Sequence, residues 1–135
     1  MKNSVFIDTS AYLARFCRKD GYHQKAVQVW QTLRKGGFPL VTSHDVIDEL
    51  ATLLGRRTSY AFSAKKLREL YESDTTIVRT AEADELEALS FFQKYADQKI
   101  SFTDCLSFVI MKKLSIKQVF TFDRHFEYLG FELFF

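Results

Sequence analysis

Little in this sequence would interrupt a regular fold or carry the chain into a membrane. Its 135 residues include one proline and five glycines, and 47% of them are hydrophobic, which argues against disorder and low complexity. Apolar runs stay well below the roughly 20 residues that span a bilayer. The first residues, MKNSVFIDTS, lack the hydrophobic stretch of a signal peptide. We therefore expect a single domain over residues 1–135, with no membrane segment, in the cytoplasm.

The sequence also has few cysteines and a small net charge. The two cysteines, Cys17 and Cys105, lie in apolar stretches without the spacing of a zinc site, so we expect free thiols. The formal net charge is only +2, too small for a protein that binds nucleic acid mainly through charge. These absences argue against a disulfide framework, a zinc module and a strongly basic nucleic-acid binder. They leave room for an enzyme whose acidic centre is offset by basic residues around it.

Short apolar segments alternate with segments of helical periodicity along the chain. Strands are expected at residues 4–7, 38–42, 75–80, 117–122 and 131–135. Helices are expected at residues 10–17, 23–33, 43–57, 63–72, 81–96 and 104–114, with a short helical turn at 123–129. This alternation, with strands apolar on both faces, predicts an α/β fold with a parallel sheet covered on both sides. Ligands bind such sheets beyond the carboxyl ends of the strands.

Four acidic residues are candidates for a ligand-binding site at this edge of the sheet. Asp8 ends the segment VFID after the first expected strand, and Asp123 ends VFTFD after the fourth. Asp104 opens an apolar helix in SFTDCLSF, and Glu49 lies in VIDEL beside the apolar stripe of its helix. Two strand ends and two helix positions are thus available to converge on one cleft.

Each of these acids also has a purely structural interpretation. Asp8 and Asp123 could cap the helices that follow them, and Glu49 could reach solvent. Ser101 and Asp104 fit the spacing of a capping box. Taken together, however, like charges brought close raise one another's pKa, and such a cluster persists only with a proton or a cation. Oxygen ligands alone suit Mg²⁺ or Mn²⁺, and the corresponding reaction class is metal-assisted phosphodiester hydrolysis.

Four segments together resemble the PIN domain and, within it, the VapC-type toxin ribonucleases of prokaryotic toxin–antitoxin pairs. They are VFIDTSAYLA, VTSHDVIDELATLLGRR, SFTDCLSFVIMKKL and VFTFDRHFEYLGF, which span nearly the whole chain in the family's order. The resemblance implies a single PIN domain with a Rossmann-like parallel β-sheet flanked by helices. It also implies a Mg²⁺- or Mn²⁺-dependent endoribonuclease that cleaves single-stranded or looped RNA, forms a homodimer and is bound by a cognate antitoxin protein.

Residue by residue, the resemblance assigns Asp8, Glu49, Asp104 and Asp123 as the catalytic acidic quartet. Asp8 and Asp104 would be the primary metal ligands. Glu49 and Asp123 would hold a water on the metal, a second ion or the activated nucleophile. Small hydroxyl residues would support the quartet as polar neighbours of its first and last acids: Thr9, Ser10 and Thr121.

Other polar residues near these segments receive structural interpretations. Asp45 pairs with Thr42 as a capping box at the start of the Glu49 helix. Asp48 is turned about 100° from Glu49 around the helix, so it is not expected in the same cleft. The three histidines lack metal-ligand spacing and are expected to be structural or surface residues: His23, His44 and His125.

The segment GRRTSYAFSAKK, between the Glu49 helix and the next, mixes cations with aromatic rings. It could contact RNA phosphates and bases, receive an amphipathic segment of an antitoxin, or form a solvated helical hairpin. The sequence leaves these three interpretations open. The residues available for RNA or antitoxin contact are Arg56, Arg57, Tyr60, Phe62 and Lys65.

Two other classes of protein that place an aspartate at a strand end fit this sequence less well. A haloacid-dehalogenase-type phosphatase needs a second aspartate two residues after Asp8, where Ser10 stands, and a response-regulator receiver needs a lysine after a late strand. The remaining alternatives keep the fold: a PIN-like scaffold that binds RNA or protein without cutting, or a standalone RNA-processing nuclease. A missing acid would favour the scaffold, and none of the quartet is missing.

Overall fold

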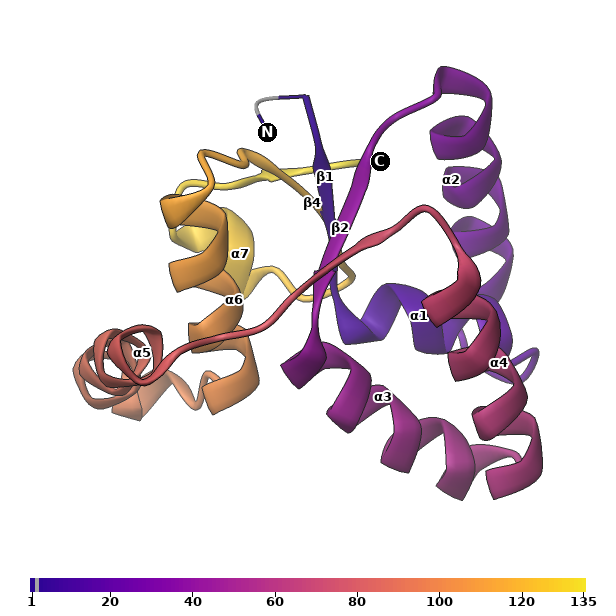
Figure 1. Cartoon of the computed structure of the whole chain (residues 1–135), viewed down its shortest axis with the longest axis horizontal. Helices are drawn as coiled ribbons and strands as arrows, with labels where there is room; N and C mark the ends of the chain where they lie inside the picture. Colours follow the sequence, from indigo (N-terminus) through magenta and orange to yellow (C-terminus); the bar gives the residue numbers. More distant parts are fainter. Residues whose placement is uncertain (2) are drawn as a thin grey trace.

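A parallel sheet forms the centre of the protein (Figure 1). The computed structural model describes Met1 and residues 3–135. Within these residues the sheet has five strands in the order β3–β2–β1–β4–β5, and each neighbouring pair is parallel. Their bounds are β1 Val5–Ile7, β2 Leu40–Ser43, β3 Thr76–Val78, β4 Gln118–Phe120 and β5 Glu132–Leu133. All three residues of the central strand β1 are fully buried, as expected for a strand covered on both faces.

Helices flank this sheet, and the predicted single α/β domain is confirmed. Figure 1 shows α2 and α4 on one side of the strands and α5, α6 and α7 on the other. The helix bounds are α1 Thr9–Phe16, α2 His23–Gly36, α3 His44–Arg57, α4 Tyr60–Glu72, α5 Glu82–Lys94, α6 Phe102–Lys113 and α7 His125–Tyr128, with a 3₁₀ turn at Ala96–Gln98. No helix among the described residues is long and apolar enough to cross a membrane.

The strand order creates a crevice between β1 and β4. From β1 the chain adds β2 and β3 toward one edge of the sheet, and then returns to add β4 and β5 on the other side of β1. Such a reversal is the usual ligand-binding point of an open parallel sheet, at the carboxyl ends of the strands. Because Ile7 pairs with Phe120, the next residues, Asp8 and Thr121, stand side by side at this point.

Serine side chains fix where three helices begin. The hydroxyl of Ser43 accepts the Val46 N–H at 3.0 Å, at the start of α3. Ser59 and Ser101 cap α4 and α6 in the same way. Each cap satisfies an amide that has no partner within its own helix, so the helix starts are set locally.

The predicted capping box between Thr42 and Asp45 is wrong. Thr42 stays in β2, and its hydroxyl donates to the carbonyl of Ile7 at 2.9 Å. The cap is instead the next hydroxyl residue, Ser43, and the Asp45 carboxylate accepts from the Thr80 hydroxyl at 3.1 Å. Adjacent Thr and Ser residues are both good caps, and the end of β2 decides between them.

The helix α6 is buried along most of its length, as its apolar sequence predicts. Its residues from Asp104 to Met111 are all buried, including the free thiol of Cys105. A helix packed on nearly every side is a rigid support. It carries Asp104 in its first turn, at the crevice between β1 and β4.

Candidate active site

The four predicted acids line one pocket of about 260 Å³ at the crevice. Each comes from a different element: Asp8 follows β1, Glu49 lies in α3, Asp104 opens α6 and Asp123 follows β4. Asp8 and Asp104 are buried, whereas Glu49 and Asp123 are half-buried at the opening. Asp8 and Asp123 are 115 positions apart in the sequence, and the fold brings them into one pocket with the other two acids.

Asp8 is the N-cap residue of α1, but its carboxylate does not cap the helix. Its backbone stays extended and its N–H donates to the Phe120 carbonyl at 3.1 Å, which continues the pairing of β1 with β4. Its side chain makes no capping bond to α1 within the described residues. Instead, Oδ2 accepts hydrogen bonds from the hydroxyls of Thr121, at 2.8 Å, and Ser10, at 3.3 Å. The other oxygen, Oδ1, is buried and has no partner in the described part of the chain.

Two of the three predicted supporting hydroxyls join the ends of β1 and β4. The Ser10 hydroxyl lies 3.1 Å from that of Thr121 and accepts the Phe122 N–H at 3.0 Å. Thr121 in turn accepts the Asp123 N–H at 2.9 Å. Thr9 also lines the pocket, but its buried hydroxyl has no partner among the described residues. Ser10 and Thr121 thus fix the carboxylate of Asp8 and the backbone of Asp123 relative to each other.

Asp123 turns the chain so that a histidine reaches the pocket. Its carboxylate accepts the His125 N–H at 2.9 Å, and His125 Nδ1 lies 3.2 Å from its Oδ2. Asp104, Asp123 and His125 each place a potential ligand atom within 4.8 Å of the others. The interpretation of His125 as a structural or surface residue missed this position. The pattern that contained the information is Asp-x-His, in which an aspartate side chain folds back on its own backbone.

The electrostatics of the pocket favour bound protons or a bound cation. Burial raises the pKa of Asp8 to about 6, against the hydrogen bond from Thr121, and the charges of Glu49 and Asp123 add to the rise. Burial also raises the pKa of Asp104 to about 9, together with the charges of Asp8, Asp123 and Glu49. Water cannot solvate these carboxylates well, and each disfavours ionisation of the others.

The residues present fit a hard divalent cation. They offer carboxylate oxygens, one of which, Asp8 Oδ1, is buried without a partner among the described residues. Oxygen-rich sites of this kind suit Mg²⁺ or Mn²⁺. Lys99 also lines the pocket, in a left-handed conformation with φ of 56° that ends the 3₁₀ turn. Its cation was not anticipated from the sequence, because no local pattern links this turn to the acids.

The contact residues predicted between α3 and α4 lie outside the acid pocket. Tyr60 is exposed and its ring packs on Gly55, whose hydrogen leaves room for it. Arg56 and Lys65 are exposed. Arg57 comes nearest to the acids: it forms an ion pair with Asp20 at 3.0 Å and lines a neighbouring cavity that includes Asp123.

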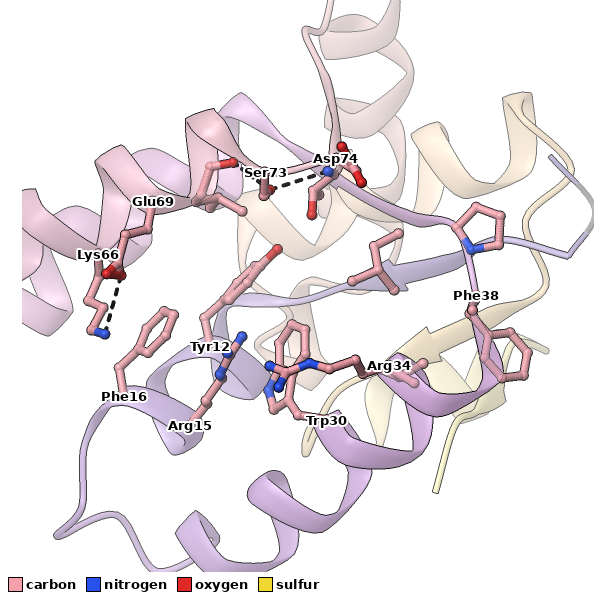
Figure 2. Close-up of a pocket in the computed structure, with 16 residues that line it drawn as sticks. Tyr12, Arg15, Phe16, Trp30, Arg34, Phe38, Lys66, Glu69, Ser73 and Asp74 are labelled. Atoms are coloured by element: carbon pink, nitrogen blue, oxygen red, sulfur yellow. Dashed lines mark hydrogen bonds and ion pairs between the residues drawn. The ribbon is translucent and has the colours of Figure 1, made fainter.

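Phe62 belongs to a separate groove on the face formed by α1, α2 and α4. One part of the groove, a cavity of about 640 Å³, is shown in Figure 2, where Arg15 lies near Trp30 and Lys66 pairs with Glu69. The Arg15 guanidinium stands 4.6 Å from the Trp30 ring centroid. A second cavity shares Arg15 and Lys66 with the first and extends the groove to Phe62.

Comparison with known proteins gives consistent matches over nearly the whole chain. A family model of the PIN domain matches residues 5–132. The 23S rRNA-specific endonuclease VapC20 of Mycobacterium tuberculosis is 32% identical over 134 residues, covering 94% of this chain and 95% of that protein. A VapC ribonuclease of Aquifex aeolicus is 28% identical over 130 residues, covering 93% and 92%. The crystal structure of M. tuberculosis VapC20, described as a Sarcin-Ricin loop cleaving toxin, matches with a TM-score of 0.84 and 26% identity, over 95% of this chain and 96% of that one.

Proposed function

This chain belongs to the PIN domain family, and we propose that it is a divalent-cation-dependent VapC-type endoribonuclease whose catalytic centre is the acid pocket. Its relatives are VapC ribonucleases, and hydrolysis of RNA is the general activity. The observation that carries the proposal is the convergence of four acids from four elements, with an unpartnered buried oxygen on Asp8 within the described residues. The loss of one of these acids would favour a scaffold that does not cut RNA, and all four are present.

The proposed roles follow from burial and position. Asp8 and Asp104, the two buried acids, would hold Mg²⁺ or Mn²⁺, with Asp123 and His125 beside them. When bound, the cation supplies positive charge at the scissile phosphate and lowers the pKa of a water molecule. Ser10 and Thr121 keep the Asp8 carboxylate in one orientation through their hydrogen bonds.

The half-buried acids are suited to proton transfer. Glu49 or Asp123 would accept the proton of the water whose oxygen attacks phosphorus, while the bond from phosphorus to the leaving oxygen breaks. Both line the pocket at its opening, where an RNA strand can enter. Lys99 lines the same pocket and offers its ammonium to the phosphate.

The experiment that tests this proposal is cleavage of RNA by purified protein with Mg²⁺, with Mn²⁺ and with chelator. We expect activity with either ion and none with chelator. Asp104→Asn should abolish cleavage and weaken Mn²⁺ binding in titration calorimetry, because a neutral amide replaces a charged ligand of nearly the same shape. The matched control is Asp48→Asn, since Asp48 is an exposed acid of α3 that pairs with His44. Full cleavage by Asp104→Asn would contradict the assignment.

The proposed substrate is single-stranded or looped RNA. The M. tuberculosis relative is specific for 23S rRNA and cleaves the Sarcin-Ricin loop. An RNA loop fits an open pocket better than a regular duplex does, because unstacked nucleotides can reach the acids. Incubation with ribosomes and with total RNA, followed by mapping of new RNA ends, would identify the site. We place this reaction in the cytoplasm.

We propose two protein partners, following the resemblance to VapC-type toxins. A cognate antitoxin would bind in the groove over α1, α2 and α4 that includes Phe62, where apolar surface lies beside Arg15 and Lys66. A second copy of the chain would cover the exposed apolar face of α5.

A further inference from the structure

A pair of stacked aromatic rings stands beside the acid pocket. Tyr22, which directly precedes α2, lies on Phe122 with ring centroids 4.5 Å apart and an angle of 11° between the planes. Phe122 is half-buried and also stacks on Phe135. Tyr22 is 56% exposed, so the pair ends in a tyrosine ring that is open to solvent.

The cavity at this ring adjoins the acid pocket. It measures about 360 Å³ and shares Ser10, Leu13 and Asp123 with that pocket. Tyr22 and Phe122 line it, and two cations stand at its rim, Arg57 and Arg124. A nucleotide with its phosphate at the acids would therefore have a neighbouring base within reach of an aromatic ring, and further phosphates within reach of arginine.

Hydrogen bonds hold this ring pair in a fixed relation to the acids. The Asp20 carboxylate accepts the Tyr22 N–H at 2.9 Å and pairs with Arg57 of α3 at 3.0 Å. On the other side, the Phe122 N–H donates to Ser10, whose hydroxyl donates to Asp8. The position of the Tyr22 ring is thus tied to the carboxylate at the centre of the pocket.

We infer that Tyr22 is a base-stacking residue of the enzyme, holding a nucleobase of the RNA next to the scissile phosphate. The inference rests on the proposed nuclease function and adds a subsite to it. Aromatic faces bind unstacked bases of single-stranded RNA with little dependence on sequence, and arginines beside them hold the backbone. The tyrosine hydroxyl is not required, because the interaction uses the face of the ring.

Binding of two probes tests the inference in chelator, where RNA cannot be cut. The first is a short single-stranded RNA of mixed sequence, and the second is an abasic oligomer with the same number of phosphates. Tyr22→Ala should weaken binding of the RNA between about five-fold and about a hundred-fold, and leave binding of the abasic oligomer unchanged. Tyr22→Phe should bind like the wild type, because it keeps the ring.

Two further variants separate stacking from packing. Tyr22→Leu keeps an apolar side chain on Phe122 without a flat aromatic face, and should lose affinity for the RNA as Tyr22→Ala does. Tyr71→Ala removes another exposed tyrosine, in α4 and outside both cavities, and should bind like the wild type. Thermal melts of all four variants establish that each is folded.

The possible results test the base-stacking role and the nuclease function separately. Equal losses for both probes, or wild-type binding of RNA by Tyr22→Ala and Tyr22→Leu, would overturn the base-stacking role while leaving the nuclease function intact. A wild-type protein that neither binds nor cuts any RNA would overturn the proposed function itself, and with it this subsite.

Discussion

Asp8 contributes both to the fold and to the acid pocket. Its backbone extends β1, and its Oδ2 joins β1 to β4 through Thr121. Its Oδ1 remains buried without a partner in the described part of the chain, which costs free energy in the absence of a ligand. Asp104 is in a similar position, because Ser101 caps its amide while its buried carboxyl faces other acids. The site therefore stores electrostatic strain that a cation would relieve.

This strain predicts an unusual dependence of stability on pH in the metal-free protein. The pKa of both carboxyls is raised above 3.8, so the folded protein holds protons that the unfolded chain has released. The contribution of these two groups to the free energy of unfolding is largest below pH 3.8. It falls as the pH rises through their folded-state pKa values of about 6 and about 9. Thermal melts in chelator across this range should show the fall, and Mn²⁺ should offset it.

Replacing one of the buried acids by a neutral residue should stabilise the metal-free protein. We expect Asp8→Asn to raise the free energy of unfolding in chelator at pH 8 by about 2 kcal/mol, because it relieves repulsion and keeps an acceptor for Thr121. Its melting temperature should also depend less on pH. Asp48→Asn, which changes an exposed acid, serves as the control. A clear loss of stability in Asp8→Asn would show that the charge at the junction of β1 and α1 is needed for folding.

At the scale of elements, the sequence predicted most of the fold because each element has a local cause. Apolar runs mark the strands and helical periodicity marks the helices. The helix starts were predicted less accurately, because Ser43 and not Thr42 caps α3, and Ser59 starts α4 at Tyr60, before the predicted residue 63. The quartet could be predicted because Asp8 and Asp123 end strands of a parallel sheet and Asp104 begins a buried helix. Lys99 could not, since a left-handed residue brings it to the pocket. His125 was missed, although the Asp-x-His pattern by which the Asp123 side chain folds back on its own backbone is local.

The helix α4 gives a prediction about the antitoxin groove. Phe62 is half-buried, with Lys66 stacked 5.5 Å from its ring centroid, whereas Lys65 is exposed. Apolar anchors contribute most of the affinity in such grooves, and charges at the rim act mainly on the association rate. Phe62→Ala should therefore weaken antitoxin binding by about 2 kcal/mol or more, and Lys65→Ala by much less, in titration calorimetry with the cognate antitoxin.

Because Phe62 also packs against the core, its replacement needs a control for folding. Phe62→Leu keeps most of the apolar volume and should retain most of the affinity, and thermal melts would show whether each variant is folded. Equal affinities for the wild type and a folded Phe62→Ala protein would remove Phe62 from the interface. The RNA-cleaving activity of Lys65→Ala should stay at the wild-type level, since Lys65 lies outside the acid pocket.

On the scale of the whole molecule, the two sides of the sheet carry different surfaces. The side with α1, α2 and α4 has the mixed basic and apolar groove. The side with α5 and α6 presents large apolar residues to solvent: Leu86, Leu89, Phe92 and Phe102. Phe92 and Phe102 contact each other edge to face, with centroids 5.6 Å apart, so the exposed residues of α5 and the start of α6 form a continuous patch. The acid pocket lies between these two surfaces, at the crevice of the sheet.

The apolar patch on α5 predicts a homodimer. Leu86 and Leu89 are 57% and 50% exposed and lie three residues apart on α5, so their side chains are neighbours on the helix surface. A two-fold interface would cover this patch on both copies at once. Leu89→Glu places two like charges in that interface and should convert the dimer to a monomer in sedimentation equilibrium, with RNA cleavage per active site measured alongside. Val27→Glu, at an exposed apolar position of α2, should leave the dimer intact, and a wild-type protein that is monomeric at every concentration would contradict the assignment.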